Sequence, residues 1–390
     1  MDLHQMKRAA AEFQTPFYVF DTDELCAKVE KIKTALQGRA KVCYAMKANP
    51  FLIDRILPAV DALEVCSPGE FAICERSEIP AGKIVLSGVY KKAEDIRSVL
   101  ESYGGDPVYT VESYSQWQMF AAYTNRMQLS IHVLLRLSNG NQFGMDQSVL
   151  EEIVAHRADC PYIHIEGVQY FTGTQKRAAS KVSRELKKLD DLVDTLREKY
   201  GYETEKLEYG PGLPVSYFDG EEEVGDMLLA GLTEALQALR FSGEVVLEMG
   251  RYIAAQCGYY FAGVVDTKVN GAQPYCLING GIHQVNYYGQ MMAMKHPPIV
   301  HLQPRGEEET AWTICGSLCT VSDVLVKQYP FHGLQTGDTL VFEKTGAYSV
   351  TEGIALFLSR DLPAVLLYSE KDGYQIARDH IAVDKYNSFH

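Results

Sequence analysis

The 390-residue chain lacks several features that would point to a particular class of protein. It has no run of about 18 apolar residues, so we expect no membrane-spanning helix. Its nine cysteines include no Cys-x-x-Cys pair, and Cys315 and Cys319 have no histidine or second cysteine pair nearby, so we expect reduced thiols and no metal site. The segment Met1–Lys7 lacks the apolar core of a signal peptide. Together these absences favour a cytoplasmic protein without a membrane anchor.

An excess of positive charge is also missing. The chain has 37 Lys and Arg residues against 51 Asp and Glu, a net charge of −14, and the acidic residues form no tail. Because nucleic-acid binding requires a basic surface, we do not expect nucleic acid to be the main partner. With 46% hydrophobic residues, a chain of this length can bury a large core and should hold two or three domains.

Short β-branched runs alternate with amphipathic stretches from about residue 40 to residue 250. The clearest helical pattern is Arg177–Lys199, whose apolar residues recur at helical spacing. Such alternation predicts a parallel sheet, and eight units match the (β/α)8 barrel. A doubly wound open sheet is the alternative, but no Gly-rich fingerprint follows the first strand. The eight expected strands are Lys41–Met46, Ala62–Cys66, Lys83–Ser87, Pro107–Val111, Ser130–Leu137, Ile163–Tyr170, Leu207–Tyr209 and Glu244–Glu248.

The pattern changes after about residue 255, where short, often alternating runs are separated by Gly, Pro and charged turns. This indicates a mostly antiparallel β domain, with Thr351–Phe357 as its one helical pattern. Pro16–Phe20 is a further strand, with no helix expected before it, and it should join that domain. We therefore expect a barrel over residues 28–253 and a β domain formed by residues 1–27 and 254–390. The later strands are expected at Gly258–Val269, Pro274–Asn279, Pro298–Gln303, Ala311–Ile314, Thr339–Lys344 and Val365–Ser369.

Lys47 follows the first expected strand directly, within Tyr44–Pro50. A lysine at the end of a buried strand is costly, because most lysines keep the ammonium group in water. Either the strand ends there and the side chain points to solvent, or the lysine has a function. In a barrel of this kind the chemistry lies at the C-terminal ends of the strands. This position makes Lys47 a candidate catalytic residue.

Residues compatible with phosphate follow the last three strands. Gly173-Thr174 and Gly210-Pro211-Gly212 offer backbone amides with little steric bulk, although ordinary turns have the same composition. Glu248 ends the eighth strand, and Arg251 comes three residues later. In one interpretation Arg251 only neutralises the Glu248 carboxylate. In the other, Arg251 holds a phosphate while Glu248 keeps a pyridine nitrogen protonated.

Taken in order, the motifs of the chain resemble the fold type III pyridoxal phosphate-dependent decarboxylases, which include diaminopimelate, ornithine and arginine decarboxylases. The resemblance covers nearly the whole chain and is carried by many ordered matches. These are Tyr44-Ala45-Met46-Lys47-Ala48-Asn49, Glu64-Val65-Cys66-Ser67-Pro68-Gly69-Glu70, Ser87-Gly88, Gln142-Phe143-Gly144-Met145, Gly173-Thr174-Gln175, Glu248-Met249-Gly250-Arg251-Tyr252, Cys315-Gly316-Ser317-Leu318-Cys319, Asp323 and Gly346-Ala347-Tyr348.

The resemblance implies that pyridoxal phosphate is the cofactor and that Lys47 carries it as a Schiff base. It implies that Glu248 pairs with the pyridine nitrogen, which favours decarboxylation over racemisation because alanine racemases of this fold have an arginine there. Cys319 matches the catalytic cysteine, a proton donor that reaches in from the partner subunit of a homodimer; otherwise it is a small buried residue. The residues implied to contact the cofactor are Lys47, Glu64, Arg136, Phe171, Thr174, Gly210, Gly212, Glu248, Arg251 and Tyr348.

Three positions depart from the family pattern. Phe171 stands where a histidine normally stacks on the cofactor, and it can stack without carrying charge. Thr320 replaces the acid that grips a distal amine, which makes ornithine and lysine poor substrates. Tyr287 aligns near the arginine that binds the distal carboxylate of diaminopimelate, and no arginine occurs between Arg251 and Arg305.

The chain is most similar to a divergent subgroup that serves butirosin and siderophore biosynthesis and accepts carrier-bound or citryl-conjugated substrates. We therefore expect decarboxylation of an amino acid within a larger, conjugated or carrier-bound molecule of secondary metabolism. A free amino-acid decarboxylase of diaminopimelate or D-amino-acid type, a racemase and a non-catalytic cofactor carrier remain alternatives. His283, Tyr287 and Thr320 are the candidate substrate residues, although residues 283–292 would also fit an apolar β-domain loop. A carrier protein would need a basic patch, for which Lys176, Arg177, Lys181, Arg184, Lys187 and Lys188 are candidates unless they form only a solvated helix face.

Overall fold

The computed structural model describes residues 1–389 and divides into two compact units. The barrel unit consists of Val29–Pro214 and Val224–Tyr252. The β unit consists of Met1–Lys28, Val215–Glu223 and the chain from Ile253 onward. Within the described residues, no helix is both long and apolar enough to cross a membrane.

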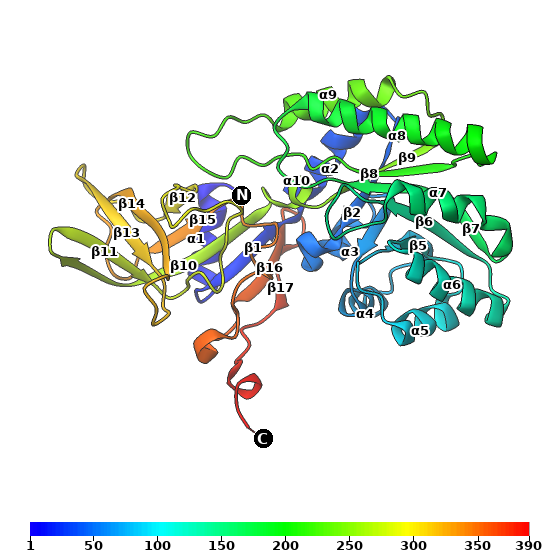
Figure 1. Ribbon diagram of the computed structural model, residues 1–390. Helices are drawn as coiled ribbons and strands as arrows, with labels where there is room; N and C mark the ends of the chain where they lie inside the picture. The colour runs from blue at the N-terminus through cyan, green and yellow to red at the C-terminus, as the bar shows by residue number, and fades with distance from the viewer. Residues whose placement is uncertain (390) are drawn as a thin grey trace. The chain divides into compact units, whose positions relative to one another are not determined.

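Eight parallel strands close the barrel, as predicted, with each strand paired to the next in chain order and the last paired to the first (Figure 1). The closing pair places Cys43 beside Glu248. The strands form where the sequence has short apolar runs, because side chains on both faces of such a sheet are buried. They are β2 (Lys41–Ala45), β3 (Ala62–Val65), β4 (Ile84–Leu86), β5 (Val108–Val111), β6 (Ile131–Leu137), β7 (Ile163–Phe171), β8 (Lys206–Gly210) and β9 (Glu244–Met249).

Helices separate the strands, and the longest confirms the predicted helical pattern. It begins at Ala179 rather than Arg177 and ends where Gly201 adopts the left-handed conformation. Its apolar stripe, from Val182 to Leu196, is buried. The helices are α2 (Thr22–Leu36), α3 (Ile53–Ile56), α4 (Pro68–Arg76), α5 (Ala93–Tyr103), α6 (Tyr114–Met127), α7 (Gln147–Ala155), α8 (Ala179–Tyr200), α9 (Gly225–Gln237) and α10 (Arg251–Ala254).

A nine-stranded, mostly antiparallel sheet forms the β unit. The N-terminal strand lies within it, as predicted, antiparallel to β10 and parallel to β16. Phe17 stacks on Phe261 with ring centroids 4.5 Å apart, in a core that includes Val341 and Leu366. The strands are β1 (Phe17–Asp21), β10 (Gly258–Asn270), β11 (Gln273–Ile278), β12 (Ile299–His301), β13 (Glu309–Cys315), β14 (Val324–His332), β15 (Thr339–Phe342), β16 (Ala364–Ser369) and β17 (Gly373–Arg378).

Several local predictions for the β unit were wrong. A helix, α1 (Leu3–Glu12), does precede β1, and it starts with a capping box in which Asp2 and Gln5 bond each other's backbone. Strands β14 and β17 were not predicted. The expected helix Thr351–Phe357 is replaced by turns and bends that lead into a short 3₁₀ helix, Phe357–Ser359. The apolar residues Ile354, Leu356 and Phe357 are exposed, so a helix there would have had no buried face to stabilise it.

Candidate active site

Lys47 lies between two acidic side chains at the C-terminal rim of the barrel. It sits in a single 3₁₀ turn that directly follows β2, and its side chain is 39% exposed. The ammonium Nζ is 2.5 Å from Glu64 Oε2 and 3.3 Å from Glu248 Oε1. These carboxylates come from β3 and β9, the two neighbours of β2 in the barrel. The side chain therefore does not simply point to solvent.

The three groups change one another's proton affinity. Burial alone would lower the pKa of Lys47, but the Glu248 and Glu64 carboxylates outweigh it and raise that pKa well above its usual value. Burial would raise the pKa of Glu64, but Lys47 and Arg136 lower it. Burial and the neighbouring Glu64 carboxylate raise the pKa of Glu248. Glu64 is thus the ionised partner of Lys47, while Glu248 readily holds a proton.

A third carboxyl group, Glu208, lies inside the barrel and was missed by the sequence analysis. It is 1% exposed and accepts a hydrogen bond from Gln169 Nε2 at 2.6 Å. The same amide nitrogen lies 3.2 Å from Ser87 Oγ. Burial and the charge of Glu64 raise the pKa of Glu208 to about 8. The available signal was an acidic residue in the middle of the predicted strand Leu207–Tyr209.

Arg136 on β6 lies at the same rim and is held by two partners. Its NH1 group is 3.1 Å from Glu112 Oε1, and its guanidinium lies 5.0 Å from the centre of the Phe143 ring. Glu112 also accepts a hydrogen bond from the Gly144 backbone at 3.2 Å. The charge of Arg136 contributes to the low pKa of Glu64. Glu112 was not predicted, since nothing in its local sequence marks it as a partner of Arg136.

The glycine loops after β7 and β8 pack closely against each other. Gly212 has a φ angle of +61°, and a Cβ atom there would overlap the carbonyl oxygen of Gly173. A Cβ atom on Gly210 would overlap the Phe171 ring and lie 3.2 Å from Glu248 Oε2. Only glycine fits these positions, so the backbone stays accessible where a phosphate could approach.

These residues fit pyridoxal phosphate. Lys47 supplies the amine, and Glu248, with its raised pKa, suits a carboxyl group that shares a proton with a ring nitrogen. Thr174 and Gly212 lie in or beside the glycine loops, and Arg251 is the first residue of α10, directly after β9. Together they provide a hydroxyl, a backbone amide and a guanidinium, all groups that bind phosphate.

Lys176 does not belong to the basic helix face on which the sequence analysis placed it. It precedes α8, and its side chain is buried against Glu185 of that helix. The ion pair explains the difference, because Glu185 lies on the buried face of α8 and its carboxylate is 2.6 Å from Lys176 Nζ. The remaining members of the proposed patch, Arg177, Lys181, Arg184, Lys187 and Lys188, are exposed.

The predicted cysteine Cys319 is exposed and lies in the loop between β13 and β14 of the β unit. Asp323 shapes this loop by accepting hydrogen bonds from the backbones of Leu318 at 2.7 Å and Ile282 at 2.9 Å. Thr320 lies within hydrogen-bond distance of Ser322, with their hydroxyl oxygens 2.9 Å apart. The loop is therefore held at its base while it presents the thiol to the surface.

The other predicted residues of the β unit differ in their surroundings. His283 is buried, and neither ring nitrogen has a hydrogen-bond partner within residues 1–389. Tyr287 is also buried and donates to the Glu343 carbonyl oxygen at 2.6 Å. Tyr348 has a φ angle of +69°, in the left-handed region that non-glycine residues rarely adopt. His283 is therefore a predicted residue whose buried polar atoms have no hydrogen-bond partner in the described part of the chain.

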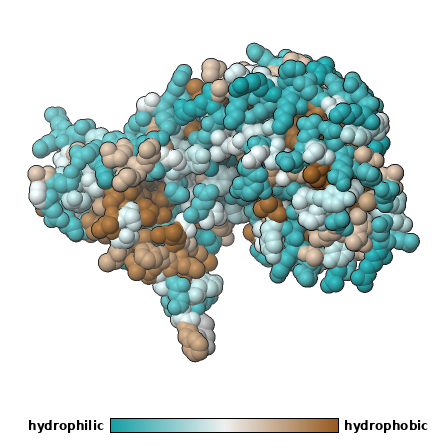
Figure 2. Space-filling view, viewed as in Figure 1, coloured by the Kyte–Doolittle hydropathy of each residue, from teal (hydrophilic) through white to brown (hydrophobic). Residues whose placement is uncertain are grey.

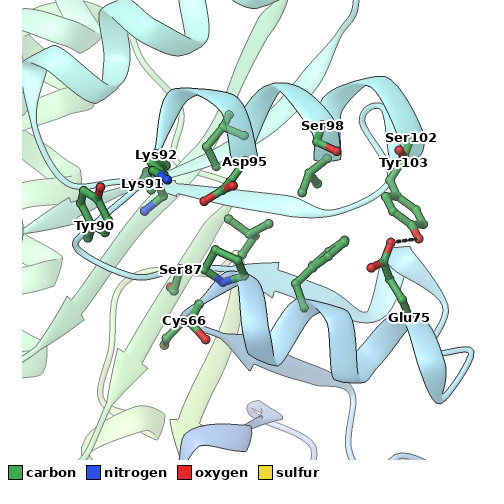
Figure 3. A pocket seen from close by; sticks show the side chains of 16 residues that line it. Cys66, Glu75, Ser87, Tyr90, Lys91, Lys92, Asp95, Ser98, Ser102 and Tyr103 are labelled. Atoms are coloured by element: carbon green, nitrogen blue, oxygen red, sulfur yellow. Dashed lines mark hydrogen bonds between the residues drawn. The ribbon is translucent and has the colours of Figure 1, made fainter. Parts of the chain in front are cut away.

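A separate cavity of about 190 Å³ lies between α4 and α5 (Figure 3). Cys66 and Ser87 line one end, and a 2.6 Å hydrogen bond from Tyr103 to Glu75 spans the other. Lys91, at the first end, donates to the Gly88 carbonyl at 2.5 Å, and burial lowers its pKa to about 8. None of the predicted cofactor residues lines this cavity.

Comparisons with known proteins show which family the chain is similar to. The family model described as "Pyridoxal-dependent decarboxylase, pyridoxal binding domain" matches residues 22–255. The L-glutamyl-[BtrI acyl-carrier protein] decarboxylase of Niallia circulans is 24% identical, over 97% of this chain and 94% of its own. The 2-[(L-alanin-3-ylcarbamoyl)methyl]-2-hydroxybutanedioate decarboxylase of Staphylococcus aureus is 25% identical, over 90% and 94%.

The structure of diaminopimelate decarboxylase from Methanocaldococcus jannaschii has the same fold. It superposes with a TM-score of 0.88, covers 98% of this chain and 94% of its own, and is 23% identical. The family match spans more than half of the chain and includes Lys47, both glycine loops and Glu248. The chain therefore belongs to the pyridoxal-dependent decarboxylase family, and it is an enzyme of the carboxy-lyase class whose cofactor is pyridoxal phosphate.

Proposed function

We propose that this enzyme removes the α-carboxylate of an amino acid that forms part of a larger, conjugated or carrier-bound molecule of secondary metabolism. The observation that carries the proposal is the absence of a counter-charge at the positions expected to hold a charged distal group. Thr320 is neutral, the Tyr287 hydroxyl is already bonded to the Glu343 carbonyl, and no arginine lies between Arg251 and Arg305. The distal ammonium or carboxylate of a free amino acid would lose its hydration on binding without gaining a group of opposite charge.

Two similar enzymes support this choice of substrate class. One is named for a glutamyl group on an acyl-carrier protein, and the other for an alanine unit joined through an amide to a hydroxybutanedioate. In both names the amino acid is joined to a larger molecule, so its distal end is an amide or carrier linkage and not a free charged group. A neutral distal subsite suits such a linkage.

The chain's residues would then act in the following way. Pyridoxal phosphate supplies a conjugated ring that takes up the electron pair left by the departing CO2. Lys47 supplies the amine that holds the cofactor, and Glu64 keeps its Nζ in place. Glu248, with its raised pKa, holds a proton at the ring nitrogen. Cys319 donates a proton to the carbon that has lost its carboxylate.

The test is CO2 release from two matched sets of substrates. One set contains free L- and D-amino acids, including glutamate, lysine, ornithine and diaminopimelate. The other contains the same amino acids acylated or amidated at the distal end, together with a carrier-bound glutamyl thioester. Turnover of the conjugated set alone supports the proposal, whereas efficient turnover of a free amino acid refutes it. Lys47→Ala is the control, and it should lose both the visible cofactor absorbance and all activity.

A free amino-acid decarboxylase of the diaminopimelate or D-amino-acid type is the second candidate. It is favoured by the whole-length structural likeness to diaminopimelate decarboxylase. The same substrate sets separate the two candidates, because this enzyme would release CO2 from diaminopimelate or from one D-amino acid and would gain nothing from distal conjugation. Racemisation is disfavoured because the β9 side chain beside Lys47 is a glutamate and not an arginine: Glu248 Oε1 lies 3.3 Å from Lys47 Nζ.

A homodimer with shared sites is part of the proposal. Apolar surface gathers over part of the β unit (Figure 2). The exposed apolar side chains of this unit include Met291, Met292, Met294, Val321, Ile354, Leu356 and Phe357. Large exposed apolar patches are typical of protein interfaces. Cys319 is exposed and lies two residues from the exposed Val321, so a dimer contact that covers Val321 would also involve the Cys319 loop.

A further inference from the structure

Lys176 contacts both ends of the glycine loop that follows β8. Its Nζ lies 3.3 Å from the Gly210 carbonyl oxygen, and its backbone N–H donates to the Gly212 carbonyl oxygen at 3.0 Å. Its side chain is 2% exposed. One residue therefore engages the two glycine carbonyls of the loop Gly210-Pro211-Gly212.

The orientation of these carbonyls matters for an anion. A carbonyl oxygen carries partial negative charge and repels a phosphate, whereas a backbone N–H attracts it. A carbonyl that is bonded to an ammonium or an amide proton cannot swing toward the phosphate. The contacts of Lys176 thus favour a loop conformation in which the carbonyls point away from the phosphate and backbone N–H groups can bind it.

Glu185 of α8 connects this lysine to the other glycine loop. Its carboxylate accepts hydrogen bonds from Lys176 Nζ, from the Tyr209 hydroxyl and from the Thr172 hydroxyl, each at 2.6 Å. Thr172 immediately precedes Gly173-Thr174, and Tyr209 immediately precedes Gly210. The same carboxylate therefore holds the start of both loops.

Lys176 and Glu185 form a buried ion pair, although burial lowers the pKa of the Lys176 ammonium group. Burial alone would raise the pKa of Glu185, but the hydrogen bonds from Lys176, Thr172 and Tyr209 lower it, so the carboxylate is ionised at neutral pH. A buried charge is strongly unfavourable unless it is paired and hydrogen-bonded. Removing one partner would leave the other unpaired and would release both loops together.

We propose that Lys176 and Glu185 are positioning residues that set the affinity for the phosphate group of the cofactor without touching it. This role goes beyond the proposed function, because it concerns binding of the cofactor and does not depend on which amino acid is the substrate. It also gives a role to a lysine that the sequence had placed on the solvent-facing side of a helix.

The test compares the binding of pyridoxal phosphate with that of pyridoxal, which lacks the phosphate. Cofactor-depleted, full-length protein is titrated with each aldehyde, and the visible absorbance of the adduct at Lys47 gives the dissociation constant. Lys176→Met should weaken binding of pyridoxal phosphate about tenfold or more, because a hydrogen bond to a charged group is lost. Binding of pyridoxal should not change, and Lys176→Arg should restore much of the phosphate preference.

Two further variants keep the test decisive. The double variant Lys176→Met with Glu185→Gln removes both charges. It therefore separates the loss of the loop contacts from the destabilisation that an unpaired Glu185 carboxylate would cause. Lys199→Met is the matched control, since Lys199 is an exposed lysine on α8 paired with Glu151. Unchanged pyridoxal phosphate binding in the single and double variants overturns the proposal. Equal weakening of both aldehydes also overturns it, because that result indicates a general structural effect.

Discussion

At the scale of single residues, three buried carboxyl groups influence one another's proton affinity, and two of them, Glu64 and Glu248, also pair with Lys47. Like charges at close range cannot all be ionised, so one group takes the charge and the others keep protons. Lys47 and Arg136 favour the ionised form of Glu64. The pKa values of Glu208 and Glu248 are raised instead. The charge distribution among these carboxyl groups thus depends on neighbours from several strands of the barrel.

Replacing Glu208 with Gln should flatten the pH dependence of stability. The pKa of Glu208 rises from 4.5 to about 8 on folding, so the folded protein holds a proton that the unfolded chain releases. The contribution of Glu208 is therefore fully present below pH 4.5 and is lost as the pH rises toward 8. The loss is at most about 1.4 kcal/mol of unfolding free energy per pH unit.

Denaturant unfolding of the cofactor-free protein across this pH range measures the effect. Glu208→Gln should show a shallower decline than the wild type. Glu203→Gln, at an exposed carboxyl group of the barrel unit, should keep the wild-type slope. Identical slopes for wild type and Glu208→Gln would mean that Glu208 is ionised in the folded protein at neutral pH.

At the scale of elements, close packing constrains the glycine loop after β8. Gly212→Ala would place a Cβ atom against the Gly173 carbonyl and force a non-glycine residue into the left-handed region. Strain of this kind costs about 1–3 kcal/mol, so affinity for pyridoxal phosphate should fall about tenfold or more. Gly220→Ala is the control, because its φ is also positive but a Cβ atom there meets nothing within 4 Å. Equal cofactor affinity in both variants would contradict the packing argument.

Helix α8 offers a way to test recognition of a carrier protein. Its exposed basic residues include Arg184 and Lys187. Reversing both, as Arg184→Glu with Lys187→Glu, should raise KM for a carrier-bound substrate severalfold and leave KM for a small conjugate unchanged. Added salt should raise KM for the carrier-bound substrate in the wild type but not in the variant. The reason is that salt screens the attraction between surface charges and an acidic partner. If the wild type and the double variant have equal KM values for the carrier-bound substrate, this face of α8 is not the docking surface.

The success of element prediction followed the strength of the local pattern. The barrel strands are apolar runs bounded by turns, so their positions could be recognised without tertiary information. Helix α1 could not, because only Met6 and Ala9 of its residues are buried. It is held instead by contacts distant in sequence, such as the hydrogen bonds from the Met1 amine to the Tyr259 hydroxyl at 2.8 Å and from the Gln5 amide to the Tyr368 hydroxyl at 3.0 Å.

At the scale of the whole molecule, shared sites can be tested by subunit exchange. Lys47→Ala and Cys319→Ala should each be impaired alone. If Cys319 acts on the partner's cofactor, mixing them should restore about one quarter of wild-type activity, because about half of randomly formed dimers are mixed and each has one intact site. Activity equal to the sum of the separate variants would show that each chain completes its own site.

The sequence by itself determined the succession of strands and helices and the order of the candidate residues along it. Local periodicity reports which faces are buried, and a residue at a strand end must lie at the barrel rim. Only the tertiary structure decided which side chains meet. Glu208 and Gln169 are partners because β7 and β8 pair in register, and Lys176 is buried because Glu185 faces inward from α8. Such contacts depend on the packing of separate elements, which no local pattern encodes.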